Sequence, residues 1–311
     1  TFMQTLEGTG CFVHTGPFAN IAHGNSSIVA DRIALKLCDY VVTESGFGAD
    51  MGAEKFFNIK CRVSGLKPDA AVVVATIRAL KVHSGRFRVI PGKPLPEEML
   101  KEDVSAIEEG IGNLRRHIEN VGKFGVPVVV ALNRFPTDSD AEVNAVIELA
   151  RECGAFDAVV SDVHARGGEG GAALAEAVVR ACEEIPANFS TLYPDDMSIK
   201  DKIKTVCTEI YRAEGVDFKP AARKAMKKYE KLGLGHLPVC MAKTQYSFSD
   251  DPKKIGAPDD FRMTVRDIHL SAGAGFFYAL TGDIMTMPGL GSKPALLNID
   301  LDDQGLPQGL F

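Results

Sequence analysis

The chain has 311 residues, 45% of them hydrophobic and 24% charged, which predicts a globular protein of about two domains. A formal net charge of -6 argues against a general nucleic-acid or membrane-surface binder, and no apolar run reaches the roughly 20 residues that span a bilayer. The seven cysteines include no C-x-x-C pair, so we expect reduced thiols and a cytoplasmic location. Because the chain opens without an initiator methionine, we expect it to be the C-terminal part of a longer protein.

The first apolar segments predict a helix and then a strand. Ser26 or Ser27 is suited to cap a helix through residues 28–37, where apolar residues recur at helical spacing. Residues 40–42 form a short Tyr-Val-Val run that is typical of a buried strand. No metal site is expected, because His23 has no other ligand at metal-binding spacing and is interpreted as a packing residue.

A glycine-containing turn follows that predicted strand. Residues 45–50 read SGFGAD, and a helix is predicted from Ala53 onwards. Open α/β sheets bind ligands where a strand, a glycine-rich turn and a helix follow one another in this way. The glycines do not match the dinucleotide-binding fingerprint, so a Rossmann site is excluded. A βα turn that binds no ligand remains the alternative interpretation.

Three further apolar runs predict strands at residues 70–76, 126–132 and 158–160. Helical patterns follow them at residues 97–121, 140–153 and 172–184. Four strands, each followed by a loop and a helix, predict an α/β fold with a parallel sheet and right-handed crossovers. The polar segments that follow the strands then line the carboxyl edge of the sheet.

The GGEGG segment lies directly before the predicted helix at residues 172–184. Its backbone N–H groups and the positive end of the helix dipole favour a bound anion. In the alternative interpretation its glycines only bend the chain. The glycines concerned are Gly167, Gly168, Gly170 and Gly171.

The composition changes after Pro186, and a second, smaller α+β domain is predicted beyond it. Its expected elements are helices at residues 198–211 and 218–232 and strands at residues 237–242 and 261–270. We place the two domains at residues 1–190 and 191–311. The sequence contains no G-x-x-x-x-G-K-[ST] phosphate-binding loop and no recognisable nucleophile–histidine motif.

Several long strings are specific enough to identify a family. They are GPFANIAHG (16–24), DYVVTESGFGADMGAEKF (39–56), NRFPTDS (133–139), ARGGEGG (165–171), AKTQYSFSDD (242–251) and SAGAGFFYALTGDIMTMPGLG (271–291). With them the whole chain resembles formate–tetrahydrofolate ligase, also called 10-formyltetrahydrofolate synthetase. The resemblance implies that ATP phosphorylates formate to formyl phosphate, whose carbonyl is then attacked by N10 of tetrahydrofolate. It also implies a P-loop-NTPase-like sheet, Mg²⁺, a stimulating monovalent cation and a homo-oligomer.

The resemblance assigns site residues by matching position. Residues near the formyl phosphate are Ala19, Asn20, Phe47 and Gly48, and the carboxylates on the Mg²⁺ side are inferred to be Glu44 and Asp50. The nucleotide contacts are Asn133 and Arg134, and the folate contacts are Phe135, Pro136 and His164. His164 stands where the family usually has a tryptophan, and imidazole offers less stacking area than indole.

The family's N-terminal portion, with its P-loop and its basic residues, has no counterpart in this sequence. Phosphoryl transfer depends on Lys, Arg and Mg²⁺ to stabilise the transferring group. We therefore expect activity only together with a missing N-terminal segment or subunit, and small molecules as the other partners. The alternative is a non-catalytic folate-binding or partner-binding module derived from the same family.

Overall fold

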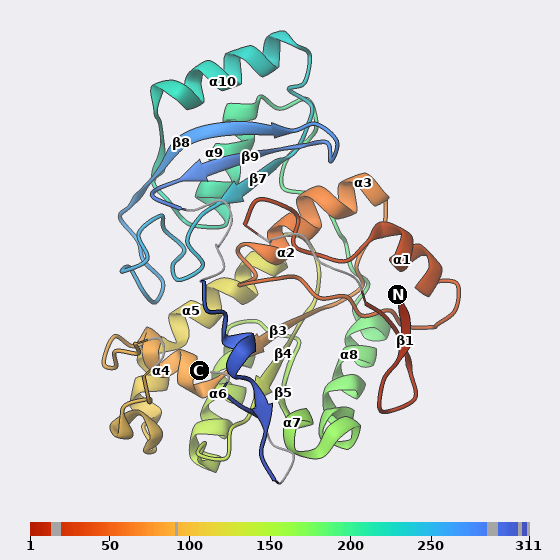
Figure 1. Cartoon of the computed structure of the whole chain (residues 1–311), viewed down its shortest axis with the longest axis vertical. Coiled ribbons are helices and arrows are strands. Elements are labelled where there is room, and N and C mark those ends of the chain that lie inside the picture. Colours follow the sequence, from red (N-terminus) through yellow and green to blue (C-terminus); the bar gives the residue numbers. More distant parts are fainter. Residues whose placement is uncertain (14–19, 91–92, 285–291, 304–306, 310–311) are drawn as a thin grey trace.

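The structure is a computed structural model that describes residues 1–13, 20–90, 93–284, 292–303 and 307–309. It contains two main β-sheets, each with its own helices (Figure 1). One hydrophobic cluster includes buried residues of both sheets, among them Val130 in the first sheet and Met263 in the second. The two sheets therefore share a continuous core.

The first sheet is parallel, with the strand order β3-β4-β5. Its strands are β3 (Ala71–Ala75), β4 (Val128–Asn133) and β5 (Asp157–Ser161). Ala75 pairs with Leu132, and Asn133 pairs with Ser161, so all three strands end at the same edge of the sheet. The predicted α/β fold with a parallel sheet is confirmed.

Helices cover both faces of this sheet and form the parallel-sheet unit with it (Figure 1). One face carries α4 (Ile77–His83), α5 (Val104–Gly122) and α6 (Asp140–Glu152), and the other carries α8 (Ala172–Glu184). Val129 of β4 packs against Ala177 and Ala181 of α8. The predicted helix from residue 97 is interrupted, because a short 3-10 helix, η2 (Glu97–Leu100), ends before Asp103 caps α5.

The helical cover is incomplete over β3. Val72 and Val74 pair with Val129 and Ala131, so all four side chains point to the face of the sheet on which α8 lies. Val129 and Ala131 are buried, whereas Val74 keeps 61% of its surface exposed. The structure therefore leaves an apolar strip uncovered at the β3 edge of the sheet.

The N-terminal part of the chain adds short elements around this unit. They are β1 (Phe2–Gln4), β2 (Gly10–Phe12), α1 (Ile28–Ala34), α2 (Gly52–Lys55), the π-helix η1 (Phe56–Cys61) and α3 (Arg62–Ser64). Ser27 caps α1 by accepting from the N–H groups of Val29 and Ala30. The helices expected after Ser27 and from Ala53 onwards are confirmed.

The strand predicted at residues 40–42 is wrong. These residues have no strand partner in the described part of the chain, and the nearest pairing is an isolated bridge between Asn25 and Ser45. Val42 keeps 86% of its surface exposed, so the apolar run is not buried. β-Branched residues form a strand only where a neighbouring strand and a buried face are available. The parallel sheet consequently has three described strands instead of four.

The second sheet is mixed and has the order β6-β8-β9-β7. Its strands are β6 (Gly215–Phe218), β7 (Val239–Ala242), β8 (Arg262–Ser271) and β9 (Phe276–Thr281). The helices α9 (Ile199–Glu209) and α10 (Pro220–Lys231) complete this mixed-sheet unit (Figure 1). The helices and strands predicted after Pro186 are all present. The chain ends with η4 (Ala295–Asn298) and the small pair β10 (Asp300–Leu301) and β11 (Pro307–Gln308).

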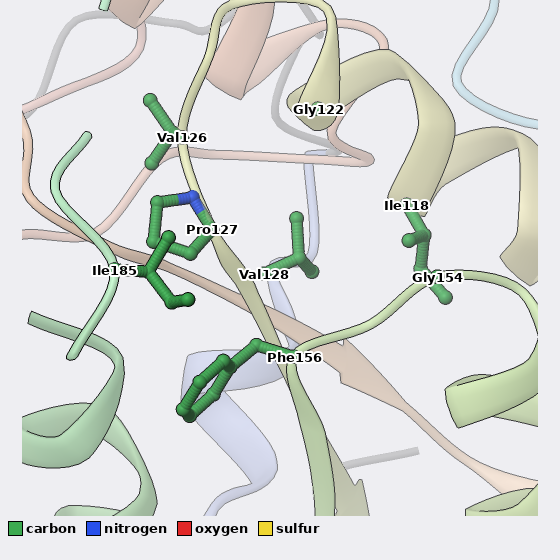
Figure 2. A pocket seen from close by; sticks show the side chains of 8 residues that line it. All are labelled: Ile118, Gly122, Val126, Pro127, Val128, Gly154, Phe156 and Ile185. Atoms are coloured by element: carbon green, nitrogen blue, oxygen red, sulfur yellow. The ribbon is translucent and has the colours of Figure 1, made fainter. Parts of the chain in front are cut away.

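An apolar pocket of about 270 Å³ lies at the amino ends of β4 and β5 (Figure 2). Its wall includes Val126, Val128, Phe156 and Ile185. The ligand edge of a parallel sheet is at the carboxyl ends of its strands, so this pocket lies at the opposite side.

Among the described residues, no helix is long and apolar enough to cross a membrane.

Candidate functional site

The predicted nucleotide and folate residues lie on two loops at the carboxyl edge of the parallel sheet (Figure 1). Because Asn133 pairs with Ser161, the segments that follow β4 and β5 leave the sheet side by side. Asn133, the last residue of β4, is exposed, as are Arg134 and Pro136 on the loop after it and His164 on the second loop. Sequence and topology together thus bring these residues to one edge.

The loop after β4 is held by hydrogen bonds that its own residues make. Asp138 is buried, its Oδ2 accepts a hydrogen bond from the Phe135 N–H (2.8 Å), and its own N–H donates to the Phe135 carbonyl (3.0 Å). Arg134 donates its N–H to the Ser161 carbonyl, and its guanidinium lies 2.8 Å from Asp140. A carboxylate that bonds to a nearby backbone N–H fixes a turn locally. The loop is therefore formed before any ligand arrives.

The Phe135 ring has a cation on one side. The guanidinium carbon of Arg78, on α4, lies 3.8 Å from the ring centroid. Arg78 also donates to the Thr137 hydroxyl (3.2 Å). The ring is half-buried, so part of it remains accessible for a ligand.

The loop after β5 begins with α7 (Val163–Arg166) and continues as the 3-10 turn η3 (Gly167–Gly171), which leads into α8. A Cβ atom at Gly170 would lie 2.3 Å from the Asp162 carbonyl oxygen. A Cβ atom at Gly171 would lie 2.9 Å from Val163 Cγ1. The last two glycines are therefore needed for the turn to pack against α7.

The first two glycines of this segment contact a carboxylate. The Gly168 N–H donates to Glu7 Oε1 at 2.7 Å, and Glu7 lies between β1 and β2. A Cβ atom at Gly167 or Gly168 would approach the Glu7 carboxylate to 3.0 Å or less. The Gly168 N–H is thus occupied by a carboxylate of the same chain.

The Ser45–Asp50 turn occupies a second location, against the mixed-sheet unit. Phe47 has a φ of 63°, a left-handed conformation that is strained for a residue with a side chain. A Cβ atom at Gly52 would lie 2.0 Å from the Gly46 carbonyl oxygen, so the helix after the turn has to begin with glycine. Glu44 and Phe47 are exposed on this turn.

A buried ion pair lies beneath the turn. Asp50 Oδ2 lies 2.9 Å from Lys243 Nζ, and the Lys243 side chain is fully buried. The Lys243 ammonium also donates to the carbonyls of Thr244 and Ser247. Burial lowers the pKa of Lys243, and the Asp50 carboxylate acts in the opposite direction. The backbone N–H of Lys243 donates to Asn20 Oδ1 at 2.9 Å, which ties Asn20 to the same group.

His117 of α5 completes this cluster. A Cβ atom at Gly48 would lie 3.2 Å from the His117 ring and 2.6 Å from Asp50 Oδ1, so only glycine fits there. His117 packs against Phe248 with 4.7 Å between the ring centroids and the two rings tilted by 40°. Burial lowers the pKa of His117, so a neutral imidazole is favoured. Three of the predicted residues, Asn20, Gly48 and Asp50, are thereby brought together.

A second buried carboxyl group, that of Glu54, lies on α2, four residues after Asp50. Glu54 is buried, Asn58 donates to its Oε1 (2.7 Å), and its Oε2 has no hydrogen-bond partner among the described residues. Burial raises the pKa of Glu54 to about 7. The carboxyl is thus held close to its point of titration at neutral pH.

Comparison with known proteins identifies the family. A family model described as formate–tetrahydrofolate ligase matches residues 1–311. Proteins named formate–tetrahydrofolate ligase are similar along 99% of this chain: 56% identity over 309 residues in Desulforamulus reducens, 56% over 310 in Symbiobacterium thermophilum and 55% over 308 in Saccharopolyspora erythraea. The chain belongs to the formate–tetrahydrofolate ligase family.

The chain spans about half the length of the curated relatives it matches, since the aligned part is 54% of each. Ala19, predicted for the site of this formate–tetrahydrofolate ligase family member, lies outside the described residues. The described residues include no group of three or more His, Cys, Asp or Glu side chains arranged to hold a metal ion. Asp50, predicted on the Mg²⁺ side, has Lys243 as its partner.

Several side chains of this family member contact predicted site residues but were not themselves predicted from the sequence. They are Arg78 behind Phe135, His117 beneath Gly48, Lys243 beside Asp50, and Glu7 at Gly168. Lys243 lies in AKTQYSFSDD, one of the strings that identify the family, and this position was the signal by which it could have been predicted as a site residue. The other three lie in patterns that look like ordinary helix or loop surface.

Proposed function

We propose that this chain forms the folate-side half of a formate–tetrahydrofolate ligase. In the complete reaction ATP phosphorylates formate, and N10 of tetrahydrofolate attacks the carbonyl carbon of formyl phosphate, which expels inorganic phosphate and gives 10-formyltetrahydrofolate. The observation that carries the proposal is the preformed loop after β4, whose Phe135 ring is partly accessible at the same sheet edge from which the segment leading to the GGEGG turn leaves. Family membership supplies the reaction class.

In this proposal the two edge loops together bind the pterin, the nucleotide and an anionic group. Phe135 and Pro136 form one wall for the pterin and His164 the other, while Asn133 and Arg134 contact the nucleotide. The GGEGG turn takes an anionic group. Stacking of a flat ring on an aromatic side chain contributes about 0.5–1.5 kcal/mol, so the smaller His164 ring makes the Phe135 side more important here.

The Ser45–Asp50 turn takes the formyl phosphate in the same proposal, with Ala19 and Asn20 beside Phe47 and Gly48. The left-handed φ of Phe47 sets the direction of the backbone groups in this turn, and the missing side chain at Gly48 lets the turn pack against Asp50 and His117. We propose Glu44 and Asp50 as the carboxylates on the Mg²⁺ side, and Glu44 is the more accessible because Asp50 contacts Lys243. The proposal also includes a monovalent cation, to which we assign no ligands.

The remaining part of the family's length is the proposed partner. The uncovered strip on β3, with Val72 and Val74, and the exposed Val42 are apolar surfaces that a further layer of structure would bury. We propose that the missing part of the family's length adds strands that complete a P-loop-NTPase-like sheet. It also supplies the Lys and Arg side chains that bind the phosphates. The proposal includes a domain boundary near residue 190, a homo-oligomer and a cytoplasmic location.

The test is formate- and tetrahydrofolate-dependent ADP release. We expect no turnover by the 311-residue chain alone and turnover when the missing half of a relative such as the Desulforamulus reducens protein is added. Turnover by the chain alone would contradict the requirement for a second half. If the added half binds and no turnover appears while folate still binds, the chain is a folate-binding module without catalysis.

A further inference from the structure

We infer that Arg78 is a positioning residue of the folate site, which backs the Phe135 ring and fixes the face on which the pterin stacks. The inference rests on the proposed function, because it takes Phe135 as the pterin wall. It adds a residue to which neither the sequence patterns nor the family resemblance gives a role.

The register of the sheet places these two side chains together. Ala75 of β3 pairs with Leu132 of β4, and Arg78 and Phe135 each lie three residues beyond their member of this pair. Thr76 caps α4 by accepting from the Ala79 N–H (3.1 Å), which fixes the first turn of the helix and with it the position of Arg78. Arg78 is therefore held at the carboxyl edge by secondary structure.

The Arg78 guanidinium lies over the face of the Phe135 ring. The distance of 3.8 Å from the guanidinium carbon to the Phe135 centroid is van der Waals contact. Thr137, on the same loop, accepts a hydrogen bond from the Arg78 guanidinium, and Arg78 Nε has no partner among the described residues. No ion pair of Arg78 with a described carboxylate is present, so its charge remains directed at the ring and the site.

This arrangement has two consequences for a flat ligand. One face of the Phe135 ring is occupied, so a pterin has only the opposite face to stack on. A cation on the first face draws the ring's π electrons towards itself and makes the opposite face less negative. That change favours the electron-rich aminopyrimidinone ring of a pterin. Arg78 thus sets both the orientation and the electronic character of the wall.

Calorimetric binding of tetrahydrofolate, kept reduced, tests the inference on the 311-residue chain. Arg78→Met should weaken binding about three- to tenfold, the size of one aromatic or cation–π contact, and Arg78→Lys should weaken it less because the charge remains. Thr137→Val should have a smaller effect in the same direction. Arg223→Met, the same change at an exposed residue of α10, is the matched control and should bind like the wild type.

A second ligand separates positioning from a general loss of structure. para-Aminobenzoylglutamate lacks the pterin, so Arg78→Met should leave its affinity unchanged, whereas a loosened site would lose affinity for both ligands. Unchanged or tighter tetrahydrofolate binding by Arg78→Met would overturn the inference and leave the proposed function intact. If the wild-type chain binds neither ligand, folate binding by this chain fails, and the inference fails with it.

Discussion

The Ser45–Asp50 turn and the loops after β4 and β5 are proposed to serve one reaction, but the protein holds them in opposite ways. The turn rests on buried polar side chains that come from distant parts of the chain: the charged Lys243 beside Asp50, and the His117 imidazole beneath Gly48. The edge loops rest mainly on local contacts, such as the hydrogen bond from the Phe135 N–H to Asp138, although Arg78 and Glu7 add contacts from distant parts of the chain. One region depends on tertiary structure, and the other is largely formed by its own sequence.

This difference predicts where mutations act. A buried charge that loses its partner costs far more than an exposed pair, because water cannot replace the partner. Changes beneath the turn should therefore lower the free energy of unfolding. Changes at the edge loops should alter ligand binding and leave stability nearly unchanged.

The largest effect is expected for Lys243→Met. The substitution leaves Asp50 buried without its cation, which costs about 3–5 kcal/mol of unfolding free energy. Urea denaturation followed by circular dichroism measures this cost. Lys227→Met, at an exposed position of α10, is the control and should change the free energy by less than about 0.5 kcal/mol.

The double substitution Asp50→Asn with Lys243→Met sharpens the test. Removing both charges leaves no unpaired ion, so the double variant should be more stable than Lys243→Met alone. If Lys243→Met costs less than about 1 kcal/mol, the turn is not held by buried charge, and the contrast between the two regions disappears.

The second effect concerns Glu54 and is a pH dependence. The pKa is about 7 in the folded chain and 4.5 without burial, so between these values the folded chain binds more protons than the unfolded chain. The free energy of unfolding should therefore fall as the pH rises from 4.5 to 7 and level off above it. The difference in pKa corresponds to about 3 kcal/mol.

Glu54→Gln should remove this pH dependence, because the amide keeps an oxygen for Asn58 and cannot ionise. The variant should match the wild type near pH 4.5 and exceed it in stability at pH 8. Glu148→Gln, at an exposed position of α6, should leave the wild-type profile unchanged. Parallel curves for Glu54→Gln and the wild type would show that Glu54 is not the group responsible.

The same contrast explains what sequence reasoning found. The strands β3, β4 and β5 and the helices α6, α8 and α10 were predicted within a few residues, because apolar periodicity and capping residues are local signals. The edge loops followed from topology, since parallel strands end together. Both kinds of information lie within short stretches of sequence.

The buried cluster has no such local signal. Lys243 lies in a polar stretch that resembles an exposed loop, yet backbone carbonyls of Thr244 and Ser247 surround its ammonium. His117 is one polar residue in the pattern of α5, and its neighbours Phe248 and Gly48 lie far from it in the sequence. The strand predicted at residues 40–42 failed for a related reason, because its formation depends on a neighbour that local sequence does not specify.

The smallest effect on stability is expected at the edge, for Glu7→Gln. The amide oxygen can still accept from the Gly168 N–H, so the midpoint of thermal unfolding should not change measurably. The charge that occupies the GGEGG turn is lost, and inorganic phosphate should therefore bind about two- to fivefold more tightly, as expected for one exposed charge. The shift of the Gly168 amide resonance on phosphate addition measures this, with the exposed Glu98→Gln as control. If the Gly168 resonance does not shift with phosphate in either the wild type or Glu7→Gln, the glycines of the GGEGG segment only bend the backbone. The anion interpretation of this loop is then wrong.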